Sequence, residues 1–210
     1  MPKKEVPLGH LQEYLPPGTS EKVMTFLHQF KVHLTIAKER KSILGDYRHR
    51  THHTNHRISV NGSLNRFSFL ITLLHELAHL LVFEEHGNKV LSHGKEWKFI
   101  YGNLLRQFLQ ERVFPADIES ELLRSLKNPA ASSCAEDDLL RVLRKYDAKE
   151  STHRLLEELL PNIQFRLDDG RIFQKGPKLR KRYKCTEVKT GKEYLFSPVY
   201  EVEIVVNRES

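Results

Sequence analysis

The stretch from Phe67 to Glu85, FSFLITLLHELAHLLVFEE, decides the fold of this chain. Its apolar residues recur at helical spacing, which predicts a core helix that ends near Gly87. His75 and His79 interrupt the apolar pattern four residues apart. Side chains at this spacing lie on one face of a helix, so both imidazoles can reach the same metal ion.

Glu76, directly after His75, adds the second group that hydrolytic chemistry requires. A carboxylate at a metal site can take the proton of the attacking water and so act as a general base. In the alternative interpretation the two histidines are hydrogen-bonded core residues and Glu76 faces solvent. Two histidines, with the acid between them on a buried helix, favour the metal site.

A third ligand must come from farther along the chain, because catalytic zinc usually has three protein ligands and one open position for water. The metzincin pattern is excluded, since Val82 stands where that class has Gly three residues after the second His. The downstream candidates are Glu85, His86, His93 and Glu96. We predict His93, because a turn after Gly87 followed by an amphipathic segment can return the chain to the first helix. Glu96 is the alternative.

The complete motif is specific. His75-Glu76-x-x-His79 is followed, after thirteen residues, by His93-Gly94-Lys95-Glu96-Trp97. This order resembles the SprT-like, Spartan-type family of zinc metalloproteases, in which a third His opens an HGxxW-type sequence. The similarity covers about residues 20 to 112. It implies a zincin-like α+β fold in which His75, His79 and His93 bind one catalytic Zn²⁺ and Glu76 activates water.

The resemblance also implies a function. The chain would be a zinc metalloendopeptidase that cleaves proteins bound or crosslinked to DNA. Two other interpretations stay open. One is a nucleic-acid-binding module whose zinc site is structural or vestigial, and the other is a peptidase with no link to DNA.

Composition fits a globular protein, with 210 residues, 39% hydrophobic and 29% charged. Two cysteines, Cys134 and Cys185, are too few for a disulfide framework and fit a reducing compartment. We expect no apolar run as long as a membrane span, and no signal core follows Met1. We therefore expect a cytoplasmic protein without a membrane partner, associated with the nucleoid in a bacterium or nuclear in a eukaryote.

Changes in composition along the chain predict four segments. The first, residues 1–18, is an arm rich in Pro and Gly, and the second, residues 19–113, is the catalytic domain. A helical connector is predicted for residues 114–161 and a basic β-rich domain for residues 162–210. SprT-like proteins often carry a C-terminal zinc ribbon with two Cys pairs. Only Cys185 lies in this last segment, so we predict a metal-free β domain and a single zinc in the chain.

Positive charge is concentrated in the last segment. The chain has a formal net charge of +7 and a pI near 9.4, which suggests a polyanionic partner. Between positions 171 and 192 there are nine Lys or Arg and one acid, Glu187. The alternative is a solvated strand face. The predicted DNA contacts are Arg171, Lys175, Lys178, Arg180, Lys181, Arg182 and Lys184.

A second group of histidines precedes the predicted core helix and comprises His49, His52, His53 and His56. No acid or helical spacing supports a metal site there. We predict an exposed hairpin tip, with neighbouring arginines as candidate phosphate contacts.

Two aromatic residues follow His93. Trp97 is expected to pack beneath the His93 turn, and Tyr101 is a candidate for an electrophilic group that assists catalysis.

Overall fold

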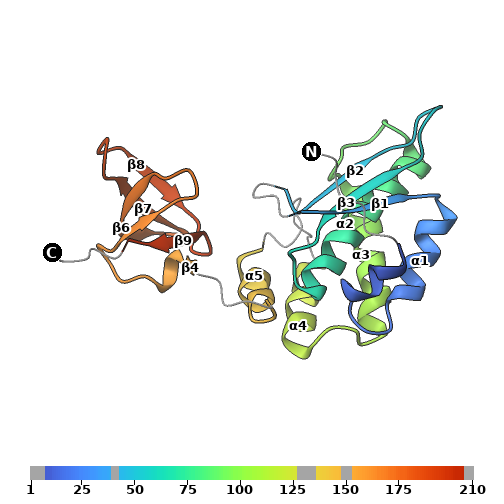
Figure 1. Ribbon diagram of the computed structural model, residues 1–210, viewed down its shortest axis with the longest axis horizontal. Helices are drawn as coiled ribbons and strands as arrows, with labels where there is room; N and C mark the ends of the chain where they lie inside the picture. Colours follow the sequence, from blue (N-terminus) through green and yellow to red (C-terminus); the bar gives the residue numbers. More distant parts are fainter. Residues whose placement is uncertain (1–7, 39–42, 127–135, 148–152, 206–210) are drawn as a thin grey trace. The chain divides into compact units, whose positions relative to one another are not determined.

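The structure is a computed structural model that describes residues 8–38, 43–126, 136–147 and 153–205 (Figure 1). The chain divides into two compact units, residues 1–148 and residues 149–210. These are called here the N-terminal unit and the C-terminal unit. Helices dominate the first and strands the second, so the α+β class predicted from the sequence is confirmed.

A three-stranded sheet forms one layer of the N-terminal unit. Its central strand, β3 (Arg57–Asn61), pairs in parallel with β1 (His33–Ala37) and antiparallel with β2 (Gly45–Arg48). β2 is therefore an edge strand. The helices of this unit are η1 (Leu8–Glu13), α1 (Ser20–Gln29), α2 (Arg66–His86), α3 (Lys95–Gln110), α4 (Ala116–Ser125) and α5 (Asp137–Arg144).

Helix α2 is the predicted core helix. The Asn65 side chain caps its N-terminus by accepting hydrogen bonds from the backbone N–H groups of Phe67 and Ser68. Gly87 follows its last turn with a φ of +59°, a conformation that glycine adopts without strain. The observed bounds confirm the helix that apolar periodicity predicts.

The expectation that no apolar run approaches the length of a membrane span is wrong for α2. By length and hydropathy alone this helix could cross a membrane, with a mean hydropathy of 1.5. However, 72% of its apolar window is buried inside the protein. The sheet packs on one side of α2 and α3 on another (Figure 1). The apolarity of α2 is therefore that of a core helix.

The described helices of the segment 114–161, α4 and α5, belong to the N-terminal unit rather than to a separate connector. Helices α4 and α5 are amphipathic and too short to be stable alone, so they bury their apolar faces in the core around α2. Their buried residues are Ile118, Leu122, Leu139 and Leu143. Asn65, the cap of α2, also donates to the Leu143 carbonyl at 3.0 Å and to the Asp147 carboxylate at 2.8 Å. α5 is thus tied to the start of α2.

The predicted N-terminal arm also takes part in this core. Leu11 and Leu15 are each 1% exposed and pack in the same cluster as α2. The turn through Pro16 and Pro17 places them, with Thr19 donating to the Pro16 carbonyl. The described residues before position 18 therefore belong to the folded unit, because their leucines provide apolar surface that the core buries.

The C-terminal unit contains a six-stranded antiparallel sheet in the order β4-β9-β5-β6-β7-β8. Its core contains three phenylalanines in contact with one another, Phe165, Phe173 and Phe196, together with aliphatic residues and the buried Cys185. β4 and η2, at the end of the predicted connector, belong to this unit. The elements are β4 (Arg154–Leu155), η2 (Leu156–Glu158), β5 (Gln164–Arg166), β6 (Ile172–Leu179), β7 (Arg182–Glu187), β8 (Glu193–Phe196) and β9 (Glu201–Ile204).

Candidate metal centre

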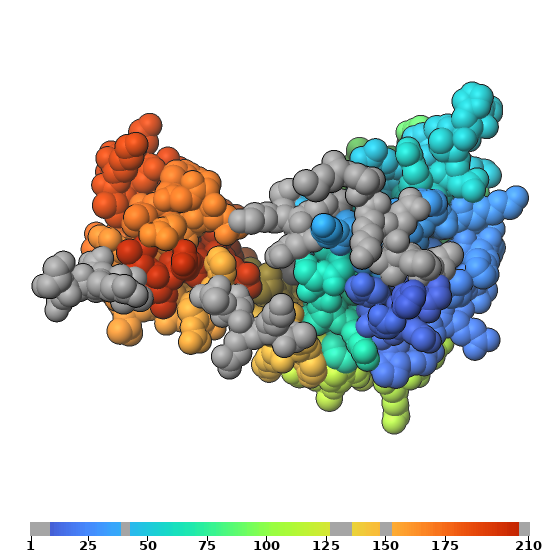
Figure 2. All heavy atoms as spheres, in the orientation of Figure 1, coloured from blue at the N-terminus to red at the C-terminus, as the bar shows by residue number. Residues whose placement is uncertain are grey.

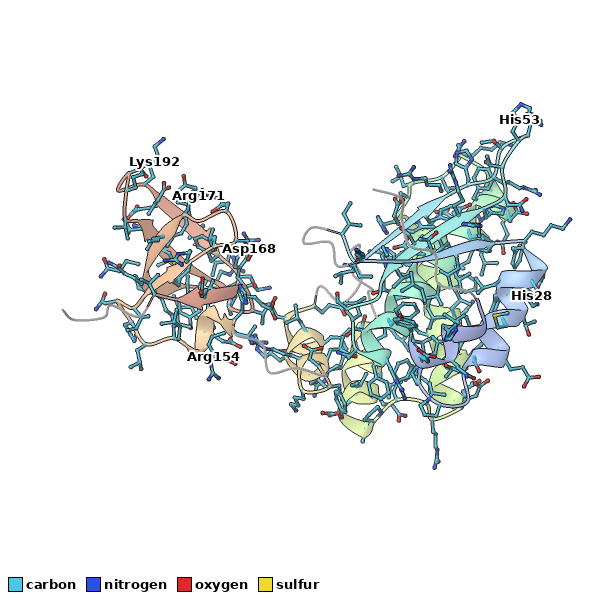
Figure 3. The ribbon with its side chains drawn as sticks, in the orientation of Figure 1. His28, His53, Arg154, Asp168, Arg171 and Lys192 are labelled. Carbon is cyan, nitrogen blue, oxygen red and sulfur yellow. The ribbon has the colours of Figure 1, made fainter. Side chains whose placement is uncertain are left out.

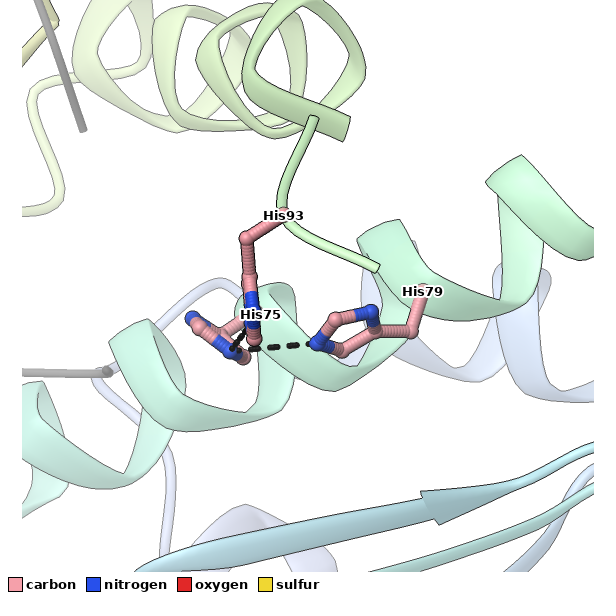
Figure 4. Close-up of side chains that lie close together, drawn as sticks. All are labelled: His75, His79 and His93. Atoms are coloured by element: carbon pink, nitrogen blue, oxygen red, sulfur yellow. Dashed lines mark hydrogen bonds between the residues drawn. The ribbon is translucent and has the colours of Figure 1, made fainter. Parts of the chain in front are cut away.

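Three histidines from two parts of the N-terminal unit converge on one point (Figure 4). Nε2 of His75 lies 3.3 Å from Nε2 of His79 and 3.2 Å from Nε2 of His93. Ligands 2.0–2.1 Å from a tetrahedral zinc ion lie about 3.3 to 3.4 Å apart. One ligand atom from each residue lies within 4.8 Å of the others. The set of donors and its spacing therefore fit a zinc ion.

The loop between α2 and α3 reverses the chain direction and brings His93 back to the two histidines of α2. After Gly87 the loop makes a tight turn, in which the Gly94 N–H donates to the Leu91 carbonyl at 3.0 Å. His93 stands at the end of this loop, one residue before the N-cap of α3. Figure 4 shows its side chain reaching from the loop toward the two histidines of α2. A loop followed by a helix thus achieves the geometry that the sequence predicts.

Trp97, on the first turn of α3, forms an aromatic floor beneath the three imidazoles. Its ring centroid lies 4.6 Å from that of His75, 5.5 Å from that of His79 and 4.8 Å from that of His93. The side chain is completely buried. Tyr101 stacks on the far end of this arrangement, 4.8 Å from Trp97, and is itself buried. Packing of this density holds the ligand rings in place before any ion binds.

The electrostatics of the cluster favour neutral imidazoles. Burial and the neighbouring His79 and His93 lower the pKa of His75 to about 3. Burial and His93 lower the pKa of His79 to about 4, and burial lowers the pKa of His93. All three rings therefore hold a free lone pair at neutral pH, which is the form that binds metal.

Glu76 packs against the edge strand of the sheet. Its side chain is 6% exposed and lies against Gly45 of the edge strand β2. His75 and His79 contact Trp97 of α3. The carboxylate is thus held between α2 and the sheet, largely shielded from bulk water.

Sequence reasoning missed a second layer behind His79. The ring of Tyr47, on β2, is parallel to that of His79 within 6° at 6.4 Å. The Tyr47 hydroxyl donates to Nδ1 of His56 at 2.9 Å, and Nε2 of His56 lies 3.2 Å from Oε1 of Glu84. The Arg50 backbone N–H also points to Nδ1 of His56, so this nitrogen is the acceptor. Burial raises the pKa of Tyr47 and lowers that of His56, so both stay neutral near pH 7.

The second histidine group is therefore divided by the fold. His56 is 2% exposed and belongs to the layer behind His79, which corrects its prediction as part of an exposed tip. His49 stacks on Phe83 of α2 at 4.5 Å. His52 and His53 are exposed, and Figure 3 places His53 at the tip of the β2–β3 hairpin. The space-filling view shows this tip projecting from the N-terminal unit (Figure 2).

The other candidate ligands from the sequence lie outside the cluster. Nε2 of His86, on the last turn of α2, is 3.6 Å from the carboxylate of Glu85. Glu96 lies on the first turn of α3, 3.9 Å from the Lys95 ammonium. Among the described residues, the one group of His, Cys, Asp or Glu side chains that could hold a metal ion is His75, His79 and His93.

The basic residues of the C-terminal unit differ widely in their surroundings. Four of them are exposed around the turn between β6 and β7, and within the described ranges none has an ion pair. They are Lys178, Arg180, Lys181 and Arg182, called here the basic turn. Arg171 pairs with Asp169 at 2.7 Å and Lys184 with Glu193 at 2.8 Å.

Lys175 does not belong to an exposed basic surface, contrary to the sequence-based prediction. It is 4% exposed, and its ammonium donates to the backbone carbonyls of Leu159 and Glu157. The ammonium also lies 4.3 Å from the centre of the Tyr183 ring. Lys175 is two residues from the buried Phe173 on β6, and side chains two apart on a strand share a face. This alternation is the signal that could have identified it.

Comparison with known proteins identifies one relationship. The model of the SprT-like family matches residues 18–118, a range that contains α2, the loop to α3 and every residue of the cluster. No curated protein and no solved structure matches the chain. Residues 18–118 therefore match the SprT-like family, which is associated with metallopeptidase-type proteins.

Proposed function

We propose that the protein is a zinc-dependent metalloendopeptidase that cleaves proteins bound or crosslinked to DNA. The observation that carries the catalytic part is the convergence of three neutral imidazoles, at spacings that fit tetrahedral zinc, with a buried carboxylate next to them on α2. The family match supports the same class of chemistry.

His75, His79 and His93 would hold the ion. Zn²⁺ bound there would act as a Lewis acid, which polarises a peptide carbonyl and makes a nearby water more acidic. The Glu76 carboxylate takes up the proton of the attacking water at one of its oxygens and returns it to the leaving amine. Trp97 and Tyr47 keep the imidazoles in fixed orientations, so little reorganisation is needed during the reaction.

The link to DNA rests on the basic turn. Its four cations have no ion pairs in the described part of the chain, so they are available to phosphate groups. Arg180 has a φ of +48°, at the tip of the turn where β6 reverses into β7. Cations on a protruding turn can contact a phosphate backbone without reading sequence. DNA binding of this kind would bring the protease to protein substrates on DNA.

Replacing Glu76 by Gln tests the catalytic part. Glu76→Gln keeps the size of the side chain but removes its ability to accept a proton. We expect the variant to retain one zinc ion per chain and to lose at least 100-fold in cleavage of a DNA-bound protein, in line with the usual contribution of a general base (on the order of 10²–10⁴).

Glu85→Gln provides the matched control, because it makes the same change at an exposed position of the same helix. It should cleave like the wild type. Undiminished cleavage by Glu76→Gln would contradict the proposed mechanism. A zinc-loaded wild type that cleaves nothing, with or without DNA, would leave a nucleic-acid-binding module with a vestigial site.

A further inference from the structure

The edge strand β2 runs alongside α2 with a regular correspondence of residues. Side chains that face the helix come from every second position of the strand. Tyr47 faces His79, and His49, which follows the strand, stacks on Phe83, four residues farther along α2. Two strand residues span about 6.8 Å and four helical residues about 6.0 Å, so neighbouring positions on the two elements stay roughly opposite each other.

Two residues before Tyr47 on the strand, Gly45 lies against Glu76, which precedes His79 by three residues on α2. A Cβ atom at Gly45 would lie 2.5 Å from Oε1 of Glu76, 2.9 Å from its Cγ and 2.7 Å from Cγ2 of Thr72. Ordinary van der Waals contacts of a Cβ begin at 3.4 Å. The strand therefore comes so close to the helix at the carboxylate that a side chain at position 45 would force Glu76 or Thr72 to shift.

The glycine is not required by backbone conformation. Its φ is not among the positive values in the structure, which in this unit occur at Gly18, Gly87, Lys31 and Arg112. The space taken by Glu76 and Thr72 is the reason why a side chain is excluded. β2 cannot readily move away, because Gly45 pairs with Val60 and the Tyr47 hydroxyl is bonded to the buried His56.

We propose that Gly45 is a positioning residue, which sets the place of the Glu76 carboxylate by allowing the strand backbone to pack directly against it. The inference rests on the proposed function of Glu76 as the general base. A methyl group at position 45 would displace the carboxylate by about 1 Å, the difference between 2.5 Å and an ordinary contact. Displacements of this size can reduce rates on the order of 100-fold.

The first experiment compares Gly45→Ala with Gly62→Ala. Gly62 provides a matched control in the same unit, because its Cβ would lie 2.8 Å from Cγ2 of Ile36, away from the cluster. Both variants should lose thermal stability. With zinc content equal to that of the wild type, Gly45→Ala should lose at least tenfold in kcat with little change in KM, whereas Gly62→Ala should keep its kcat. Wild-type kcat in zinc-loaded Gly45→Ala would overturn the inference.

A second experiment does not depend on activity. In a double-mutant cycle, Gly45→Ala is measured in the wild type and in the Glu76→Ala background, with the melting temperature as the readout. We expect Gly45→Ala to lower the melting temperature in the wild type and to lower it less, or not at all, in Glu76→Ala, where the methyl enters vacated space. Equal losses in both backgrounds would contradict the inference. If the wild type proves inactive, the proposed function fails and this cycle alone decides the inference.

Discussion

The two units use their polar side chains in opposite ways. In the N-terminal unit, buried polar groups converge: three imidazoles meet at one point, Tyr47 faces one of them, and His56 is hydrogen-bonded to Tyr47. In the C-terminal unit, the cations of the basic turn are exposed to solvent. Convergence with burial lowers the pKa of His75 and His79 to values at which both rings are neutral.

This difference predicts how much function a single substitution should remove in each unit. A site made by convergence depends on every member, so the loss of one residue should remove the function. A surface made by dispersed charges loses affinity in proportion to the charges removed. Two residues depart from this contrast. Lys175 is a buried cation in the C-terminal unit, and Tyr47 packs behind the cluster without being one of its three ligands.

The largest effect is expected for His93→Ala. Removing one of three imidazoles should lower zinc affinity by at least 100-fold and abolish peptide cleavage, because the two remaining ligands bind zinc weakly. Zinc content after dialysis and the fluorescence of Trp97, the single Trp of the chain, report on binding. Glu96→Ala is the control and should retain its zinc. Full zinc content in His93→Ala would remove His93 from the ligand set.

The next largest effect is expected when the basic turn is neutralised. Changing Lys178, Arg180, Lys181 and Arg182 to Ala together should weaken duplex DNA binding by about ten- to a thousand-fold near physiological salt. The slope of log affinity against log salt should become shallower by about 0.9 for each phosphate group that the protein no longer neutralises. Cleavage of a free peptide should not change. Unaltered DNA affinity and slope would favour a peptidase without a DNA link.

Lys175 tests whether a buried cation in the C-terminal unit acts through structure. Lys175→Met keeps an unbranched apolar side chain but leaves the Leu159 and Glu157 carbonyls without their donor. Loss of a buried partner costs about 1–3 kcal/mol of unfolding free energy. Lys178→Met, at an exposed position, should leave stability within about 0.5 kcal/mol of the wild type. Chemical denaturation of both variants makes the comparison, and equal stabilities would mean that Lys175 is not structural.

The sequence predicts the cluster well because each of its parts is local. α2 follows from apolar periodicity, and His75 and His79 follow from their spacing on one helix. His93 requires only that a short loop turns back, and the HGxxW resemblance indicates the same residue. The fold class also follows, since before position 112 the strand patterns come together and are followed by helical patterns.

The predictions that were wrong depend on packing between distant segments. α4 and α5 have clear apolar faces, but their sequences do not say which core receives Ile118 or Leu139. Gly45 carries no signal in the sequence, because its importance comes from the closeness of Glu76 on a different element. The residues around His56 predict a polar tip, and only the pairing of β2 with β3 brings His56 beside Tyr47.

The smallest effect is expected for Tyr47→Phe. This variant tests whether the layer behind His79 orients that ligand without itself binding metal. The variant keeps the ring parallel to His79 but removes the hydroxyl that donates to His56. Loss of one such hydrogen bond costs about 0.5–1.5 kcal/mol of stability. Zinc affinity should fall by less than tenfold, because all three ligands remain. Tyr194→Phe, in the C-terminal unit, should change neither quantity, and loss of all zinc from Tyr47→Phe would mean that this layer is part of the site itself.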